Sequence, residues 1–236
     1  MMRLQGSGPR PSWRFVLGAF VALFLAASLT PTAARAVPIT ANASGSPTPG
    51  TTTWPSTLTN GDFTIGTDDG ALGGVAAIVG DGMNEWTTWT FDFSSDPNFS
   101  TFSLTQPLGN ALLTLTLTPY KPIKTKPNGA PGGIASDTVR IQGLADISDP
   151  AITTLSPVGV QKTITIDLLN YYTSGQILGI LGGSGGLLSM YYQDDAIISY
   201  AQLDLATVPE PATLLLLGSG LGGLGLVRRR LKALRA

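Results

Sequence analysis

Apolar and polar residues alternate with a period of two through most of the central part of the chain. Each of the clearest runs places large apolar side chains on one face and polar side chains on the other; the polar residues are mostly threonine or aspartate, except for Arg140 and Gln142 in one run. Such alternation indicates half-buried antiparallel strands, and threonine favours strands while remaining soluble. The apolar members of these runs are Trp89, Phe91, Phe93, Leu113, Leu115, Leu117, Val139, Ile141, Ile164, Ile166 and Leu168.

Two further elements and the residues between the strands complete the predicted fold. Residues 196–205 alternate and predict a closing strand, with Ile197 and Ile198 on opposite faces. Residues 174–181 predict one short helix with Ser174 as its N-cap, and the glycine-rich residues 182–186 should end it as a loop. Many short strands separated by Gly, Pro, Asn and Asp predict an all-β fold, a single antiparallel β-sandwich of jelly-roll or immunoglobulin-like type.

The stretch before the first alternating run has a different composition. Residues 40–55 consist largely of Ser, Thr, Pro and Gly, which predicts an extended and mobile segment. We therefore assign residues 37–56 to a low-complexity lead-in and residues 57–207 to the sandwich.

The first 36 residues have the three parts of a secretory signal peptide. Basic residues precede an apolar run over residues 15–29, and Ala34 and Ala36 frame a small-x-small cleavage pattern. Export through the Sec translocon and cleavage by signal peptidase after Ala36 would make Val37 the first residue of the mature protein.

The C-terminal stretch also has three consecutive parts. The tripeptide Pro209-Glu210-Pro211 is followed by a charge-free, Leu- and Gly-rich run over residues 212–227 and then by Arg228-Arg229-Arg230. The apolar run is close to the length that crosses a bilayer as a helix, and the basic residues 228–236 favour the cytoplasmic side. This order predicts a transmembrane anchor that leaves everything before Val208 outside the cytoplasm.

This tail resembles the PEP-CTERM sorting signal of Gram-negative bacteria, which has the same three parts in the same order. The resemblance covers residues 208–236. It implies that an exosortase, a membrane transpeptidase-like enzyme, recognises Pro209, Glu210 and Pro211, while Arg228, Arg229 and Arg230 stop and orient the anchor. It also implies a setting of exopolysaccharide and biofilm production. The precursor would be anchored in the inner membrane and then pass to the cell envelope, the cell surface or the extracellular matrix.

Composition narrows the chemistry available to the exported part. The chain of 236 residues contains no cysteine and no histidine, which excludes thiol chemistry, the Ser-His-Asp triad and the usual zinc and copper ligands. Residues 37–207 hold five basic and fourteen acidic residues, a net charge of about −9. A surface of that charge repels phosphate backbones, so we expect no nucleic-acid partner.

Two kinds of ligand site remain candidates. Adjacent acids in turns are suited to calcium, with Asp194 and Asp195 the best pair, although aspartate also favours turns for its own backbone hydrogen bonds. We expect no other cofactor. Aromatic side chains can stack on sugars, and Tyr191 and Tyr192 are the best carbohydrate candidates because neighbours on a strand face opposite ways. Burial in the core is the alternative. The wider aromatic set is Trp54, Trp86, Tyr120, Tyr171, Tyr172, Tyr191 and Tyr192.

The sequence therefore predicts an exported, non-enzymatic protein of the cell surface or extracellular matrix, associated with exopolysaccharide. The alternative is a carbohydrate-binding module that retains matrix polysaccharide at the surface. A glycosidase with two catalytic carboxylates is a third hypothesis. Glu85 is the only glutamate between residues 37 and 207, so such a pair would need an aspartate.

Overall fold

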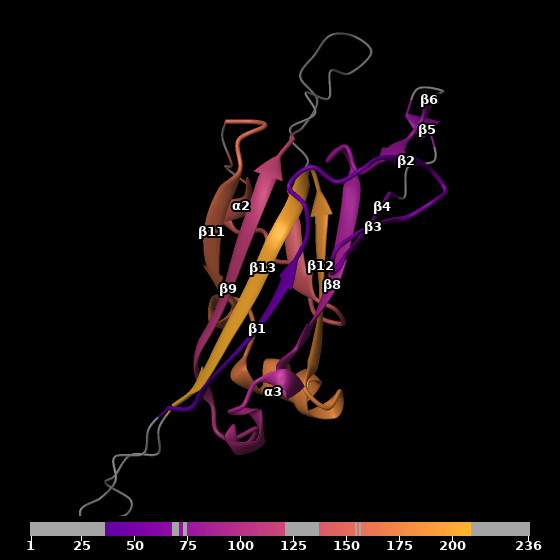
Figure 1. Ribbon diagram of the computed structural model, residues 1–236. Coiled ribbons are helices and arrows are strands. Elements are labelled where there is room, and N and C mark those ends of the chain that lie inside the picture. Colours follow the sequence, from indigo (N-terminus) through magenta and orange to yellow (C-terminus); the bar gives the residue numbers. More distant parts are fainter. Residues whose placement is uncertain are drawn as a thin grey trace, which may run out of the picture. The chain divides into compact units, whose positions relative to one another are not determined.

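The computed structural model describes residues 36–67, 71–72, 75–120, 137–153, 155 and 157–208, of which Ala36–Val208 forms one compact unit. Two antiparallel sheets dominate it (Figure 1). The first has the order β1-β13-β9-β11, with bounds β1 (Pro38–Ser44), β13 (Ala196–Thr207), β9 (Leu108–Pro119) and β11 (Lys162–Asp167). The second has the order β10-β12-β8-β4-β3, with bounds β10 (Thr138–Ile141), β12 (Leu187–Asp194), β8 (Glu85–Asp92), β4 (Phe63–Gly66) and β3 (Leu58–Asn60).

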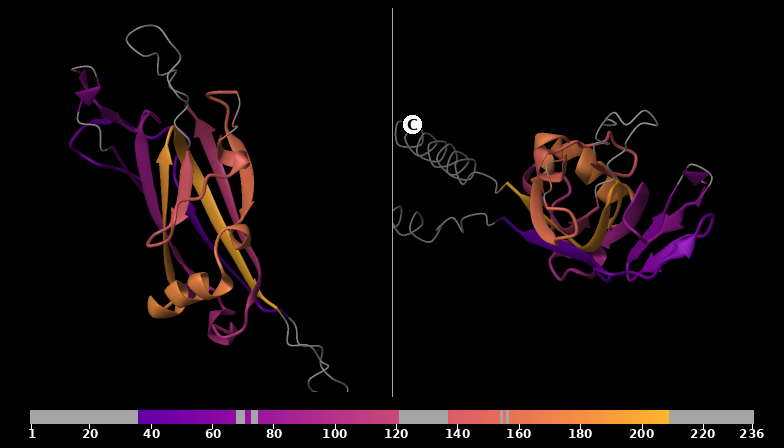
Figure 2. Two further views of the ribbon diagram at one scale, coloured as in Figure 1. Left: turned by 180° about the vertical axis from the view of Figure 1, so that it is seen from behind. Right: turned by 90° about the horizontal axis from the view of Figure 1, so that it is seen from above.

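Short elements complete the described part of the chain. Two ribbons pair β2 (Thr52–Thr53) with β7 (Ile78–Val79) and β5 (Ala71–Leu72) with β6 (Val75–Ala76). The helical segments are α2 (Pro150–Thr153), α3 (Ser174–Gly183) and the 3-10 turns η1 (Phe93–Ser95), η2 (Phe99–Thr101) and η3 (Leu168–Asn170). Seen from behind in Figure 2, α3 lies at one end of the strands and β5 and β6 lie toward the other. The all-β prediction is confirmed.

The core lies between the two main sheets. One hydrophobic cluster joins the inward side chains of both, which makes the pair a β-sandwich. On β8 the predicted alternation is confirmed, since Trp89 and Phe91 are buried and their rings meet edge to face at 6.0 Å. Strand β13 departs from strict alternation, because a register shift between Ile198 and Tyr200 leaves both Ile197 and Ile198 buried.

The lead-in prediction is wrong for residues 38–44, which form β1. The small or branched residues Ile39, Ala41 and Ala43 are buried in the core, and the strand pairs with β13 from Pro38 opposite Ala206 onward. Alanines between polar residues carry a weak hydrophobic signal, so the sequence does not reveal this strand, which pairs with β13. The exported domain, which we call the ectodomain, therefore begins at β1.

The predicted helix is present as α3, but its N-cap is Thr173 and not Ser174. Thr173 and Gln176 form a capping box, each side chain accepting from the other residue's backbone N–H. The Ser174 hydroxyl instead accepts from the backbone N–H of Leu108 at 2.7 Å, which ties α3 to the start of β9. The helix continues to Gly183, into the stretch expected to be a loop.

Several predicted features lie outside the described residues. These include Ala34 and the rest of the signal peptide before residue 36, the tripeptide Pro209-Glu210-Pro211 and the cluster Arg228-Arg229-Arg230. Among the residues that are described, no helix is both long enough and apolar enough to cross a membrane.

Candidate functional site

The outward face of the five-stranded sheet carries a regular array of hydroxyl side chains. Thr88 and Thr90 alternate along β8 with buried neighbours and point away from the core. The strand register places Thr88 between Thr64 on β4 and Tyr191 on β12. It also places Thr90 beside Ser189, and their hydroxyl oxygens lie 2.9 Å apart. Three strands, β4, β8 and β12, thus present one polar surface.

A groove of about 570 Å³ lies over this array, where β1 approaches β8. Its lining residues are Thr40, Ala41, Asn42, Asp62, Thr64, Thr88, Trp89, Thr90, Asp92, Ser95, Gln142 and Ser189. All of these except Ala41 and Trp89 carry a hydroxyl, amide or carboxylate group. None of these lining residues, all of them in the described part of the chain, is basic.

Two strand edges border the groove. Strand β1 is an edge strand of its sheet. Strand β4 pairs with β8 only at residues 86–88 of β8, so β8 extends beyond β4. The β1 edge is held on either side of the groove, since Thr40 N–H donates to Asp96 Oδ2 and Ser44 N–H donates to Asp62 Oδ2, both at 2.8 Å. Backbone hydrogen bonds to carboxylates therefore fix the wall of the groove.

A row of stacked side chains crosses the same face beside the groove. The rings of Trp86 and Tyr191 lie within 17° of parallel with their centroids 6.4 Å apart, and the guanidinium carbon of Arg140 lies 4.0 Å from the Tyr191 centroid. The Trp86 indole lies over Gly66, where a Cβ atom would collide with it. Glycine at this position of β4 makes room for the indole. We call Trp86, Tyr191 and Arg140 the aromatic row.

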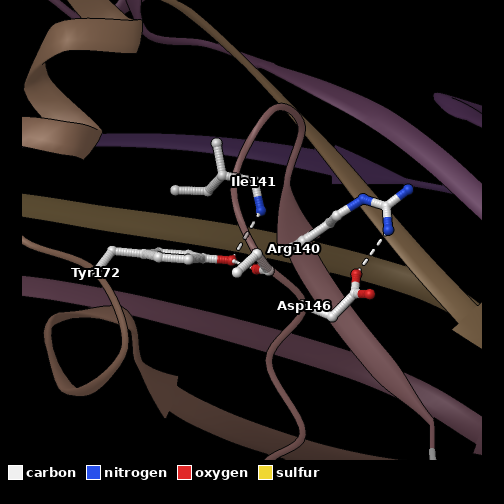
Figure 3. Close-up of polar contacts among 5 residues, drawn as sticks. Arg140, Ile141, Asp146 and Tyr172 are labelled. Atoms are coloured by element: carbon white, nitrogen blue, oxygen red, sulfur yellow. Dashed lines mark hydrogen bonds and ion pairs between the residues drawn. The ribbon is translucent and has the colours of Figure 1, made fainter.

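Buried and surface contacts together support the Arg140 end of the row (Figure 3). Arg140 pairs with Asp146 at 2.6 Å across the turn that follows β10. The Tyr172 hydroxyl donates to the Ala145 carbonyl at 2.6 Å and accepts from Ile141 N–H at 3.4 Å. Burial raises the pKa of Tyr172, so this hydroxyl keeps its proton at neutral pH. The turn that carries Asp146 is therefore anchored to the core.

The structure separates the two predicted carbohydrate residues. Tyr191 faces outward in the aromatic row, whereas Tyr192 is 1% exposed and donates its hydroxyl to Asp137 at 2.7 Å. Tyr192 is a core residue and the sugar-contact prediction is wrong for it, because neighbouring residues of a strand face opposite sides. Trp86 belonged to the wider aromatic set. It lies two residues from Thr88 on the same strand, so the alternation predicts that its side chain faces outward as that of Thr88 does. Arg140 was not predicted as a site residue, because it meets Tyr191 only through the pairing of two strands that are distant in sequence.

The predicted calcium residues have different outcomes. Asp195 is buried, and its Oδ1 accepts from Asn84 N–H at 2.9 Å, so this carboxylate holds the loop before β8. The side chain of Asp194 lies outside the described part of the chain. Within that part, no group of three acidic side chains is placed to hold a metal ion. Calcium binding stays a prediction.

Glu85, the sole glutamate of the ectodomain, lies at the start of β8 and is 2% exposed. Its Oε1 accepts from the backbone N–H groups of Gly80 and Asp81, while Oε2 has no hydrogen-bond partner among the described residues. Burial is the main cause that raises the pKa of Glu85 to about 7, and the nearby Asp81 carboxylate adds to it. Glu85 is therefore closed to a polymeric substrate.

Comparison with known proteins bears on the C-terminal part of the chain. The family model of the PEP-CTERM protein-sorting motif matches residues 207–230. Neither the curated proteins nor the solved structures contain a match. The match begins at Thr207, the buried last residue of β13, so it starts where the core strand ends. The resemblance of the tail is confirmed: the chain carries a PEP-CTERM sorting motif, and this marks it as an exported, exosortase-processed protein of the cell envelope.

Proposed function

We propose that this protein is a non-enzymatic component of the cell surface or extracellular matrix that associates with exopolysaccharide. The observation that carries the proposal is the combination of a sorting motif with a sandwich whose outward face offers hydroxyl and aromatic side chains. Such a surface suits a polyhydroxylated polymer. We also propose that the host is a Gram-negative bacterium and that the tail acts in its inner membrane.

The chemistry of the ectodomain supports a non-enzymatic role. Histidine and cysteine are absent from the sequence, and Glu85 is buried. The two acids in the groove are structural hydrogen-bond acceptors: Asp62 holds Ser44 of β1, and Asp92 Oδ1 accepts from Ser94 N–H at 2.9 Å. A glycosidase needs an acid in a raised-pKa, accessible position opposite a second carboxylate. In the groove, Asp62 and Asp92 each accept a hydrogen bond from a backbone N–H group instead.

The strand boundaries support two processing events. Strand β1 begins at Pro38, directly after the predicted mature start Val37, and β13 ends at Thr207, just before Pro209. Cleavage by signal peptidase and by an exosortase would therefore remove none of the described strands. Pro209, Glu210 and Pro211 would serve in recognition, residues 212–227 as the anchor, and the arginine cluster as the stop and orientation signal.

Intact-mass analysis tests the sorting part of the proposal. Protein would be recovered from cells and medium of an exosortase-bearing host and of its exosortase deletion. We expect a wild-type product from Val37 to the region of residues 208–211 and a retained tail in the deletion. Glu210→Ala should also retain the tail. A tail kept in both strains, or normal processing of Glu210→Ala, would refute exosortase recognition.

Matrix retention tests the association with exopolysaccharide. The processed protein should remain with the matrix of a host that makes exopolysaccharide and appear free in the medium of a mutant that makes none. Equal retention in both strains would contradict the association. The carbohydrate-binding module is the more specific form of this function, and the aromatic row and groove favour it over a purely structural role.

A further inference from the structure

We propose that the outward face of the five-stranded sheet is a binding site for a neutral polysaccharide chain. The groove would hydrogen-bond to sugar hydroxyls, and Trp86 and Tyr191 would pack against the apolar faces of sugar rings. The inference rests on the proposed function and deepens it, because it names the site and the class of ligand. We call Thr64, Trp86, Thr88, Thr90, Ser189 and Tyr191 the glycan face.

The hydroxyl array matches the chemistry of sugar hydroxyl groups. Each Thr or Ser hydroxyl both donates and accepts a hydrogen bond, as each sugar hydroxyl does. Thr64, Thr88 and Thr90 come from two adjacent strands and line one groove with Ser189. The groove volume of about 570 Å³ lies in the usual range of ligand sites, about 300–1,000 Å³. It is therefore large enough for a short stretch of a polysaccharide chain.

The aromatic row supplies apolar surface next to this groove. Its two rings are close to parallel, and their 6.4 Å centroid separation lies toward the upper end of the range of aromatic pairs, about 4.5–7 Å, as for offset rings. Neither ring fully covers the other, and both residues are half-buried. Trp86 is held over Gly66, and the Arg140 guanidinium covers one face of the Tyr191 ring, so little side-chain freedom remains to be lost on binding.

Charge selects a neutral ligand over an acidic one. Asp62 and Asp92 line the groove, and no basic residue is among the described residues that line it. The one cation of the row, Arg140, is already paired with Asp146. An acidic polysaccharide would therefore meet unfavourable carboxylates along the groove without a free cation to compensate. A lining this polar also differs from the apolar centre of a stable protein interface.

Native affinity electrophoresis of the processed protein tests the site. The gels would contain hydroxyethyl cellulose, dextran or laminarin as neutral probes, and polygalacturonate as the acidic probe. We expect retardation by at least one neutral probe and none by polygalacturonate. Trp86→Ala and Tyr191→Ala remove the ring surface and should weaken binding about tenfold or more, a loss of about 1.4 kcal/mol. Thr88→Val, which removes a hydroxyl and keeps the shape, should weaken binding several-fold.

Matched controls come from the outward face of the other sheet. Tyr200→Ala and Thr114→Val change the same residue types on β13 and β9 and should leave retardation unchanged. Loss of binding by Trp86→Ala supports the site only if this variant unfolds at the same temperature as wild type. Thr88→Val is the second test, because it leaves the packing intact. Retardation that persists in Trp86→Ala, Tyr191→Ala and Thr88→Val would overturn the inference. So would retardation by polygalacturonate alone or by no neutral probe.

The matrix-retention assay separates failure of the site from failure of the proposed function. Exopolysaccharide-dependent retention of wild type and of Trp86→Ala alike would remove the site and leave the function standing. Retention lost in Trp86→Ala and kept in Tyr200→Ala would support both. Sedimentation that shows a dimer abolished by Tyr191→Ala, without retardation by any probe, would assign the face to a second copy and overturn the glycan site.

Discussion

Glu85→Gln should make the ectodomain more stable at alkaline pH and remove a pH dependence of its stability. The glutamate is buried, its Oε1 accepts from Gly80 and Asp81, and Oε2 has no hydrogen-bond partner among the described residues. Glutamine preserves the accepting oxygen in its side-chain carbonyl. It also replaces the unpartnered, ionisable oxygen with a neutral amide next to the Asp81 carboxylate.

The magnitude follows from the raised pKa. Glu85 has an ordinary value of 4.5 and a pKa of about 7 in the folded protein, mainly because of burial. One pKa unit is about 1.4 kcal/mol, so the ionised form costs the folded state about 3 kcal/mol. Between pH 4.5 and 7 the folded state binds more protons than the unfolded state. Its stability therefore falls as pH rises through that window, and the full loss is reached above pH 7.

Urea unfolding from pH 4 to pH 8.5 measures this loss. Wild type and Glu85→Gln should have similar free energies of unfolding at pH 4, where glutamate is neutral. At pH 8.5 the variant should be more stable, by a difference of about 3 kcal/mol at most. Subtracting the two curves cancels the titration of groups that do not interact with Glu85; Asp81, whose carboxylate helps raise the pKa of Glu85, is the exception. A difference that stays constant with pH, or a variant that is less stable at pH 8.5, would refute the reasoning.

Three further substitutions test local contacts of the ectodomain. Tyr172→Phe removes two hydrogen bonds, the part-buried one to Ala145 and the buried one from Ile141, and should lower the free energy of unfolding in urea by about 1–3 kcal/mol. Thr173→Ala removes the N-cap of α3 and should cost about 1 kcal/mol in the same assay; no change would refute the capping box. Gly66→Val should displace the Trp86 indole and weaken retardation by the neutral probe about tenfold. Unchanged retardation would show that the position of the indole does not matter.

The face on which a side chain lies was largely readable from the sequence. The period of two along β8 placed Trp89 and Phe91 inside and Thr88 and Thr90 outside, as the structure has them. The three-part tail was equally legible, because its signal is composition and order over a short stretch, and the family model matches it. Both kinds of information are local, since side-chain direction along a strand depends only on the pleat.

The site itself was decided by tertiary structure. Arg140 and Tyr191 are 51 residues apart in sequence, and they stack only because β10 pairs with β12 in one register. The groove exists only where the β1 edge lies near β8, and β1 was hidden in a stretch of low complexity. Strand order and register depend on hydrogen bonds between distant segments and on packing of the whole core. Local pattern therefore determines which way each side chain points, and only the folded sheets determine what it meets.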